Sequence, residues 1–172
     1  MKPQTLFLFF TLVFLFPKGL PAQEEAAKTS FFDLIHTDGL LKVELHVNID
    51  SILANKRTNE YFPAVLTFED RDGNEQEWEL KVRSRGRFRR SRCEFPPLRL
   101  EFDKDDMRAK DMHTFDSYKL VTHCLEGAEG TENVMRECLI YQMYQVIEPE
   151  RSIRSQLVRI RYRDTESRRK IT

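Results

Sequence analysis

Alternation of apolar and polar side chains limits the fold of this chain more than any other sequence feature. Between residues 40 and 50, every second side chain is apolar: Leu41, Val43, Leu45, Val47 and Ile49. A period of two places the apolar side chains on one face of a β-strand and the polar ones on the other. Similar segments cover residues 62–70, 74–86, 96–104 and 156–164, and residues 117–124 form a shorter apolar one. With a turn at Asp72-Gly73, the pattern predicts a mainly antiparallel, twisted sheet.

One principal helix is predicted before the last strand. Thr131 is a suitable N-cap and Pro149 marks the end, which gives about 15 residues. The apolar residues lie nearly all round this helix, so we expect it to be buried. A short helix is also predicted from a cap at Asp50 or Ser51 to about Arg57. The predicted fold class is therefore α+β, with a single domain over residues 40–172.

The N-terminus has the layout of a secretory signal peptide. Lys2 is basic, residues 5–16 are apolar, and Ala22 precedes a suitable cleavage point, so we predict a signal peptide over 1–22 and a polar leader over 23–39. The apolar run is shorter than the roughly 20 residues of a membrane span, and an uncleaved anchor is the alternative. We expect an exported protein in the periplasm, outside the cell or at its surface, with no stable membrane span after cleavage.

The C-terminus resembles a hairpin that stops as its second strand begins, at Ile171. We therefore expect the domain to be truncated at this end.

Three cysteines allow one disulfide in an exported protein. Cys138 lies in the apolar segment VMRECLIYQMY, where a small buried residue fits. We therefore propose a bridge between Cys93 and Cys124. Spacing does not fix the connectivity, and the other pairings stay open.

A strongly basic segment, KVRSRGRFRRSR, covers residues 81–92, where seven of twelve residues are Lys or Arg. Without Lys2 and Lys18, the mature chain has 26 basic residues against 28 acidic ones, so this charge is local. On the outer face of the sheet, Glu101 and Asp103 are expected opposite Lys81 and Arg83, which balances only part of it.

Arginine suits bidentate contacts with phosphate or carboxylate, and a glycine lets the backbone approach an anion. The predicted phosphate- or anion-binding residues are Arg83, Arg85, Gly86, Arg87 and Arg89. A solvated loop, or contact with an acidic polymer or with membrane headgroups, is the alternative. Nucleic acid is not expected as a partner, because Phe88 is the one aromatic side chain in the segment.

Other common sites are not predicted. The four histidines show no helical ligand spacing, so no metal site is expected. The chain contains no GxGxxG, P-loop or nucleophile-elbow motif. The sequence motifs do not identify any catalytic residue, so the catalytic residues are unknown.

The order of VRSRG, PPLRLEFDK, YKLV, the VMRECLIYQMY helix and SQLVRIRY resembles the spore-coat-H-like (CotH) family of atypical kinases over about residues 82–162. The chain is also similar, and more closely, to a group of secreted bacterial proteins that share RG-RR, C-FPPL and LVTHC segments.

The kinase resemblance implies the N-terminal part of a kinase-like domain that uses ATP and a divalent metal. Arg85 and Gly86 correspond to the family's RG, and Lys119 with Glu137 could form its lysine–glutamate ion pair; two ordinary surface charges are the alternative. This chain differs from the family's pattern at Arg87 and Phe88. Its metal-binding and catalytic acids lie beyond the matched segment, so this chain alone is expected to be inactive.

The sequence thus predicts an exported protein with an arginine-rich anion-binding loop, which could belong to an atypical kinase. The alternative is a non-catalytic envelope or surface protein that binds an acidic protein or a glycan. A structural domain with a solvated loop is the third interpretation.

Overall fold

The computed structural model describes residues 28–124, 127–167 and 170–171, and the predicted signal peptide lies outside these ranges. The strands form one sheet in the order β5-β4-β3-β2-β1-β6-β7. Their bounds are β1 Leu41–Val47, β2 Phe62–Glu69, β3 Glu75–Ser84, β4 Leu98–Phe102, β5 Ser117–Leu120, β6 Val158–Asp164 and β7 Lys170–Ile171. Neighbouring strands are antiparallel, except β1 and β6, which are parallel.

The predicted α+β class and mainly antiparallel sheet are therefore confirmed. The predicted C-terminal hairpin is also present, because β7 pairs antiparallel with β6.

The helices are α1 Phe31–Ile35, α2 Ile49–Ala54, α3 Arg89–Arg92, α4 Lys104–Ala109 and α5 Gly127–Ile147. Helix α2 begins earlier than predicted because its N-cap is Asn48. The side chain of Asn48 accepts a hydrogen bond from the backbone N–H of Ser51 at 2.8 Å, so Asp50 and Ser51 lie inside the helix.

One face of the sheet carries the hydrophobic core, as the alternation predicts. In β3, for example, Trp78, Leu80 and Val82 are buried. Phe31 from α1 packs into this core, with its ring 5.3 Å from that of Trp78 and 4.2 Å from that of Phe102. Phe31 is 1% exposed, so the ordered domain includes part of the segment predicted as a polar leader.

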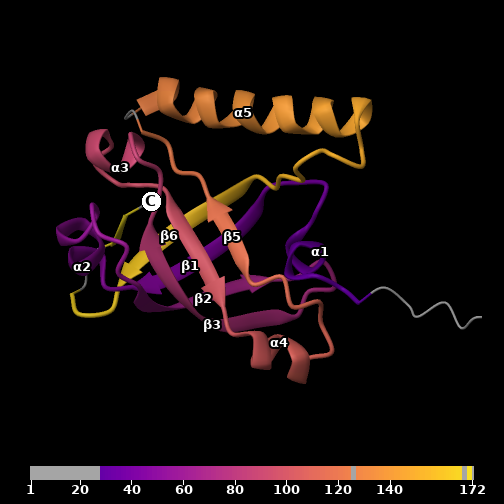
Figure 1. The fold of residues 1–172 in the computed structure, drawn as a ribbon, viewed down its shortest axis with the longest axis horizontal. Helices are drawn as coiled ribbons and strands as arrows, with labels where there is room; N and C mark the ends of the chain where they lie inside the picture. The colour runs from indigo at the N-terminus through magenta and orange to yellow at the C-terminus, as the bar shows by residue number, and fades with distance from the viewer. Residues whose placement is uncertain (1–27, 125–126, 168–169, 172) are drawn as a thin grey trace, which may run out of the picture.

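Helix α5 differs from its prediction. It has 21 residues, and Gly130 and Cys138 are its buried residues. Figure 1 shows α5 at the periphery of the molecule, above the end of β5 and beside α3. In that position one side of the helix can meet the rest of the domain. Because the apolar residues lie all round the helix, the other side leaves several of them exposed, and the expectation of a buried helix was wrong.

Candidate functional site

Three cationic side chains lie side by side across neighbouring strands. The register places Arg83 of β3 opposite Arg99 of β4, and Arg99 opposite Lys119 of β5. Residues that face each other across strands share one face of the sheet, and like charges in that arrangement are destabilising. We call Arg83, Arg99 and Lys119 the cationic row.

The register also corrects the predicted ion pairs of the outer face. Lys81 lies opposite Glu101, one of the two carboxylates expected on this face. Arg83, however, lies opposite Arg99, so neither Glu101 nor Asp103 faces it. Asp103 lies after the end of β4, where its side chain accepts a hydrogen bond from the backbone N–H of Asp105 at 2.7 Å and caps α4. Asp103 therefore caps a helix, and Arg83 faces another arginine instead of a carboxylate.

A tight bend after β3 brings more arginines to the row. Gly86 has a φ of 83°, a conformation that side-chain-bearing residues rarely adopt. The backbone N–H of Arg85 donates to the carbonyl of the buried Pro97 at 2.8 Å, and that of Arg90 donates to the carbonyl of Gly86 at 3.3 Å. These bonds fold the basic segment back over the ends of β3 and β4.

The first of two neighbouring cavities has a volume of about 460 Å³. It is lined by Asn59 and Gly86 and by six cationic side chains: Arg83, Arg85, Arg87, Arg90, Arg99 and Lys119. No carboxylate is among its lining residues. We call it the cationic cavity.

Uncharged groups hold several of these arginines in place. Arg83 and Arg90 both donate to the side-chain oxygen of Asn59, at 3.3 and 3.1 Å, and Arg99 donates to the hydroxyl of Ser117 at 2.6 Å. Within the described ranges, none of the six cations forms an ion pair. Their positive charge is therefore oriented but not neutralised.

The second cavity, of about 350 Å³, shares Arg85, Gly86, Arg87 and Lys119 with the first. Its further lining residues are Phe88, Arg89, Pro97, Val121 and, from α5, Glu137 and Tyr141. This half of the site is thus partly apolar and carries one carboxylate.

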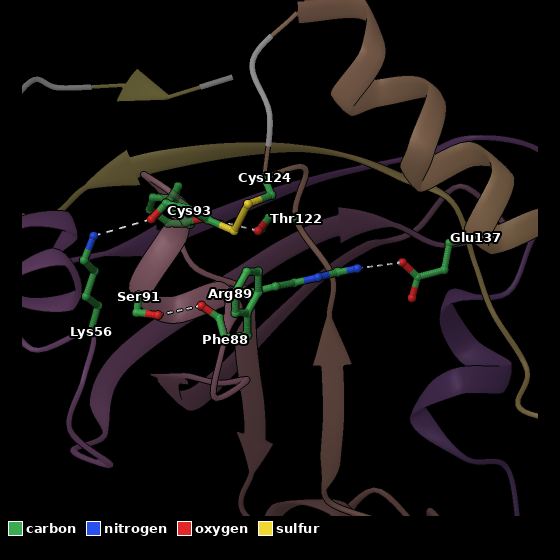
Figure 2. Close-up of a disulfide and its surroundings, with 9 residues drawn as sticks. Lys56, Phe88, Arg89, Ser91, Cys93, Thr122, Cys124 and Glu137 are labelled. Carbon is green, nitrogen blue, oxygen red and sulfur yellow. Dashed lines mark hydrogen bonds and ion pairs between the residues drawn. A yellow bond between two sulfur atoms is a disulfide. The ribbon is translucent and has the colours of Figure 1, made fainter.

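Glu137 pairs with Arg89 and not with Lys119. A side-chain nitrogen of Arg89 lies 3.3 Å from an oxygen of Glu137, and Figure 2 shows the two side chains extended toward each other. In the part of the chain that the structure describes, Lys119 and Glu137 line the same cavity without an ion pair between them. The possible pair of Lys119 with Glu137 is therefore not formed among the described residues, where Glu137 pairs with Arg89.

The surroundings of Arg85 disfavour its positive charge. Its pKa is lowered, first by burial and then by the positive charges of Arg89 and Arg99. The guanidinium remains charged at neutral pH, because arginine titrates far above that range. A bound anion would relieve this repulsion.

A disulfide holds the site together. The structure joins Cys93 to Cys124, with 4.7 Å between their Cα atoms, which confirms the predicted pairing, and Cys138 is free and buried. Cys93 follows the basic segment and Cys124 follows β5, so the bridge ties the loop to the chain that leads into α5 (Figure 2). Two walls of the site are thereby linked covalently.

Four of the five predicted anion-binding residues line the cationic cavity: Arg83, Arg85, Gly86 and Arg87. Arg89 lines the second cavity instead. Sequence reasoning did not list Arg90, Arg99 or Asn59. The alternation of β4 is a sequence signal that places Arg99 on the outer face, the same face as Arg83. No sequence signal marks Asn59.

Comparisons with protein-family models, curated proteins and solved structures give no match to this chain. Among the described residues, no cluster of three or more His, Cys, Asp or Glu side chains could hold a metal ion. In the same residues, no helix has both the length and the apolar character of a membrane span.

Proposed function

We propose that this protein binds a ligand with two or more linked phosphates at the cationic cavity. The observation that carries the proposal is a cavity lined by six cations and by no carboxylate. Arginine is the side chain best suited to phosphate, through paired N–H donors in a fixed fork.

The cationic row favours an extended anion over a single phosphate. Neighbouring strands lie about 4.8 Å apart, so the row of Arg83, Arg99 and Lys119 extends over about 10 Å. A single orthophosphate can lie between two members of the row. A diphosphate or triphosphate can contact all three, and Arg85 and Arg87 can close over it from the loop.

The residues of the site fit phosphate groups better than they fit a divalent metal. Mg²⁺ is bound through carboxylates and phosphates, and the cationic cavity has no carboxylate. A role in an atypical kinase, with ATP and a divalent metal, therefore rests on the sequence resemblance. The geometry of the cavity supports phosphate binding and gives no support for phosphoryl transfer.

We also propose that the protein acts outside the cytoplasm. The support is the N-terminal sequence together with the Cys93–Cys124 bridge, because disulfides persist mainly in oxidising compartments.

The test is calorimetric titration with orthophosphate, pyrophosphate and tripolyphosphate. We expect affinity to increase with each added phosphate and to fall as salt is raised. The double change Arg85→Ala and Arg87→Ala should weaken pyrophosphate binding about tenfold or more, which corresponds to about 1.4 kcal/mol. Lys81→Ala is the matched control, because Lys81 lies on the same face opposite Glu101 and does not line the cavity.

Absence of phosphate binding by the unaltered protein would refute the proposal. An equal loss in the Lys81→Ala control would show that general charge, and not the cavity, attracts the anion. If a sulfated polysaccharide bound more tightly than tripolyphosphate, and the double change abolished that binding, the alternative of a glycan-binding surface protein would be favoured.

A further inference from the structure

We propose that the protein forms a symmetric dimer through the outward face of α5, with the two copies of the helix antiparallel. Seven large apolar side chains of α5 are about half exposed or more: Met135, Leu139, Ile140, Met143, Tyr144, Val146 and Ile147. Val146 is 85% exposed and Ile147 is 76% exposed. We call these seven side chains the α5 face.

The α5 face is large enough for a stable interface. A large side chain has a full accessible area of about 150 to 200 Å². Multiplied by the exposed fractions of the seven side chains, this gives a total exposed area of roughly 650 to 850 Å². The largest apolar patch on a typical monomer covers about 300 to 600 Å². A standard protein interface buries about 800 Å² on each partner, which the α5 face approaches by itself.

The spacing of these side chains suits a second helix. Leu139, Met143 and Val146 follow each other at intervals of four and three residues, which is the seam of paired helices. The opposite side of α5 carries the buried Cys138 and the residues that line the second cavity. Figure 1 shows α5 along the periphery of the domain, with no other element beyond it, so a second copy can approach.

The charged side chain on this face does not oppose a second copy. Arg136 lies 2.6 Å from an oxygen of Glu132 on the same helix, so its charge is balanced within one subunit.

A membrane surface is a poorer occupant of the face. Helices that lie on membranes carry many Lys and Arg residues on their polar side. Helix α5 has one basic residue, Arg136, against three glutamates: Glu129, Glu132 and Glu137. Anionic headgroups would therefore be repelled, whereas a second copy supplies an apolar surface of the same size.

Mass measurement in solution tests the proposal. We expect a dimer from sedimentation or light scattering at about 10 to 100 µM protein, as for a dissociation constant near 1 µM. Met143→Lys should give a monomer that melts at nearly the same temperature, because Met143 is 57% exposed and the change places two lysines together at the axis. Met143→Leu is the conservative control and should remain a dimer.

A cross-link tests the orientation. Met143→Cys should join two copies under mild oxidation, because the residue lies at the axis. Thr131→Cys is exposed on the same helix but lies about 18 Å from the axis, so it should not form the cross-link.

Several results would overturn the proposal: a monomer at all these concentrations, a dimer that survives Met143→Lys, equal cross-linking at residue 131, or binding of uncharged lipid vesicles by a monomer. The proposal does not depend on phosphate binding. Met143→Lys should leave the pyrophosphate titration unchanged, so failure of the dimer and failure of the anion site are distinguishable.

Discussion

The cationic row predicts that removal of one of its positive charges raises the stability of the protein. Lys119 is exposed, lies opposite Arg99 and has no carboxylate partner among the described residues. Its neutralisation in Lys119→Gln should therefore stabilise the ligand-free protein. At a separation of about 6 Å and an effective dielectric constant between 40 and 80, the repulsion is roughly 0.7 to 1.4 kcal/mol. Exposed pairs measure about 0.2 to 1 kcal/mol, so we expect about 0.5 kcal/mol.

Urea unfolding at low salt measures this gain, which corresponds to a rise of about 1 to 2 °C in melting temperature. The control is Lys81→Gln, where the cross-strand neighbour is the carboxylate Glu101, so the same chemical change should not stabilise the protein. The gain in Lys119→Gln should shrink as salt screens the charges. With tripolyphosphate present, Lys119→Gln should become the less stable protein. A loss of stability in Lys119→Gln at low salt without ligand would refute the reasoning.

Three further predictions concern the bend, the bridge and the sheet. Reduction of Cys93–Cys124, which closes a loop across 31 positions, should lower the free energy of unfolding by about 3 to 4 kcal/mol, and an unchanged urea midpoint with reductant would contradict the bridge. Gly86→Ala should cost about 1 to 2 kcal/mol because φ is positive, and it should also weaken pyrophosphate binding; an unchanged unfolding midpoint would argue against this bend. The pKa of Glu44 is lowered from 4.5 to about 2, chiefly by its hydrogen bond from Arg163, so its contribution is present above pH 4.5 and is lost as the pH falls to 2. Glu44→Gln should therefore remove part of the acid dependence of stability, by at most about 1 kcal/mol, and an unaltered pH profile would exclude the pairing.

Local sequence was sufficient for most of the fold. The period of two in residues 40–50 predicts a strand with one buried face, and Leu45 is fully buried in the structure. The Asp72-Gly73 turn fixed the partner of the following strand. Periodicity could not reveal that Phe31, which lies outside any alternating segment, fills the aromatic core. Its burial depends on the tertiary contacts of α1.

Helix α5 shows a different limit of sequence reasoning. An apolar pattern all round a helix indicates that the helix needs cover on every side. The pattern does not say whether that cover belongs to the same folded domain. Within the described residues the domain covers the side that contains Gly130 and Cys138, and Met143 remains exposed.

The candidate site depended on register, which alternation leaves undetermined. Sequence placed Arg83 and Arg99 on the same face of the sheet, but Arg83 was expected to face a carboxylate of β4, and Glu101 lies only two residues from Arg99. A shift of two residues keeps every side chain on its face, so it does not disturb the hydrophobic pattern, yet it exchanges an ion pair for a repulsive one. The hydrophobic core therefore specifies the faces, and only the structure identifies which charges meet.

Elsewhere on the outer face of the sheet, opposite charges lie next to each other. The like charges around the cationic cavity are therefore exceptions. Glu44 lies between two arginines of β6, and Lys81 lies opposite Glu101. Around the cationic cavity, three departures occur together: like charges in register, a glycine with positive φ and arginines without carboxylate partners. Natural proteins tend to break local rules where function requires it. Charge placed at random would leave such exceptions scattered, whereas here they converge on one cavity, which favours a ligand over a solvated loop.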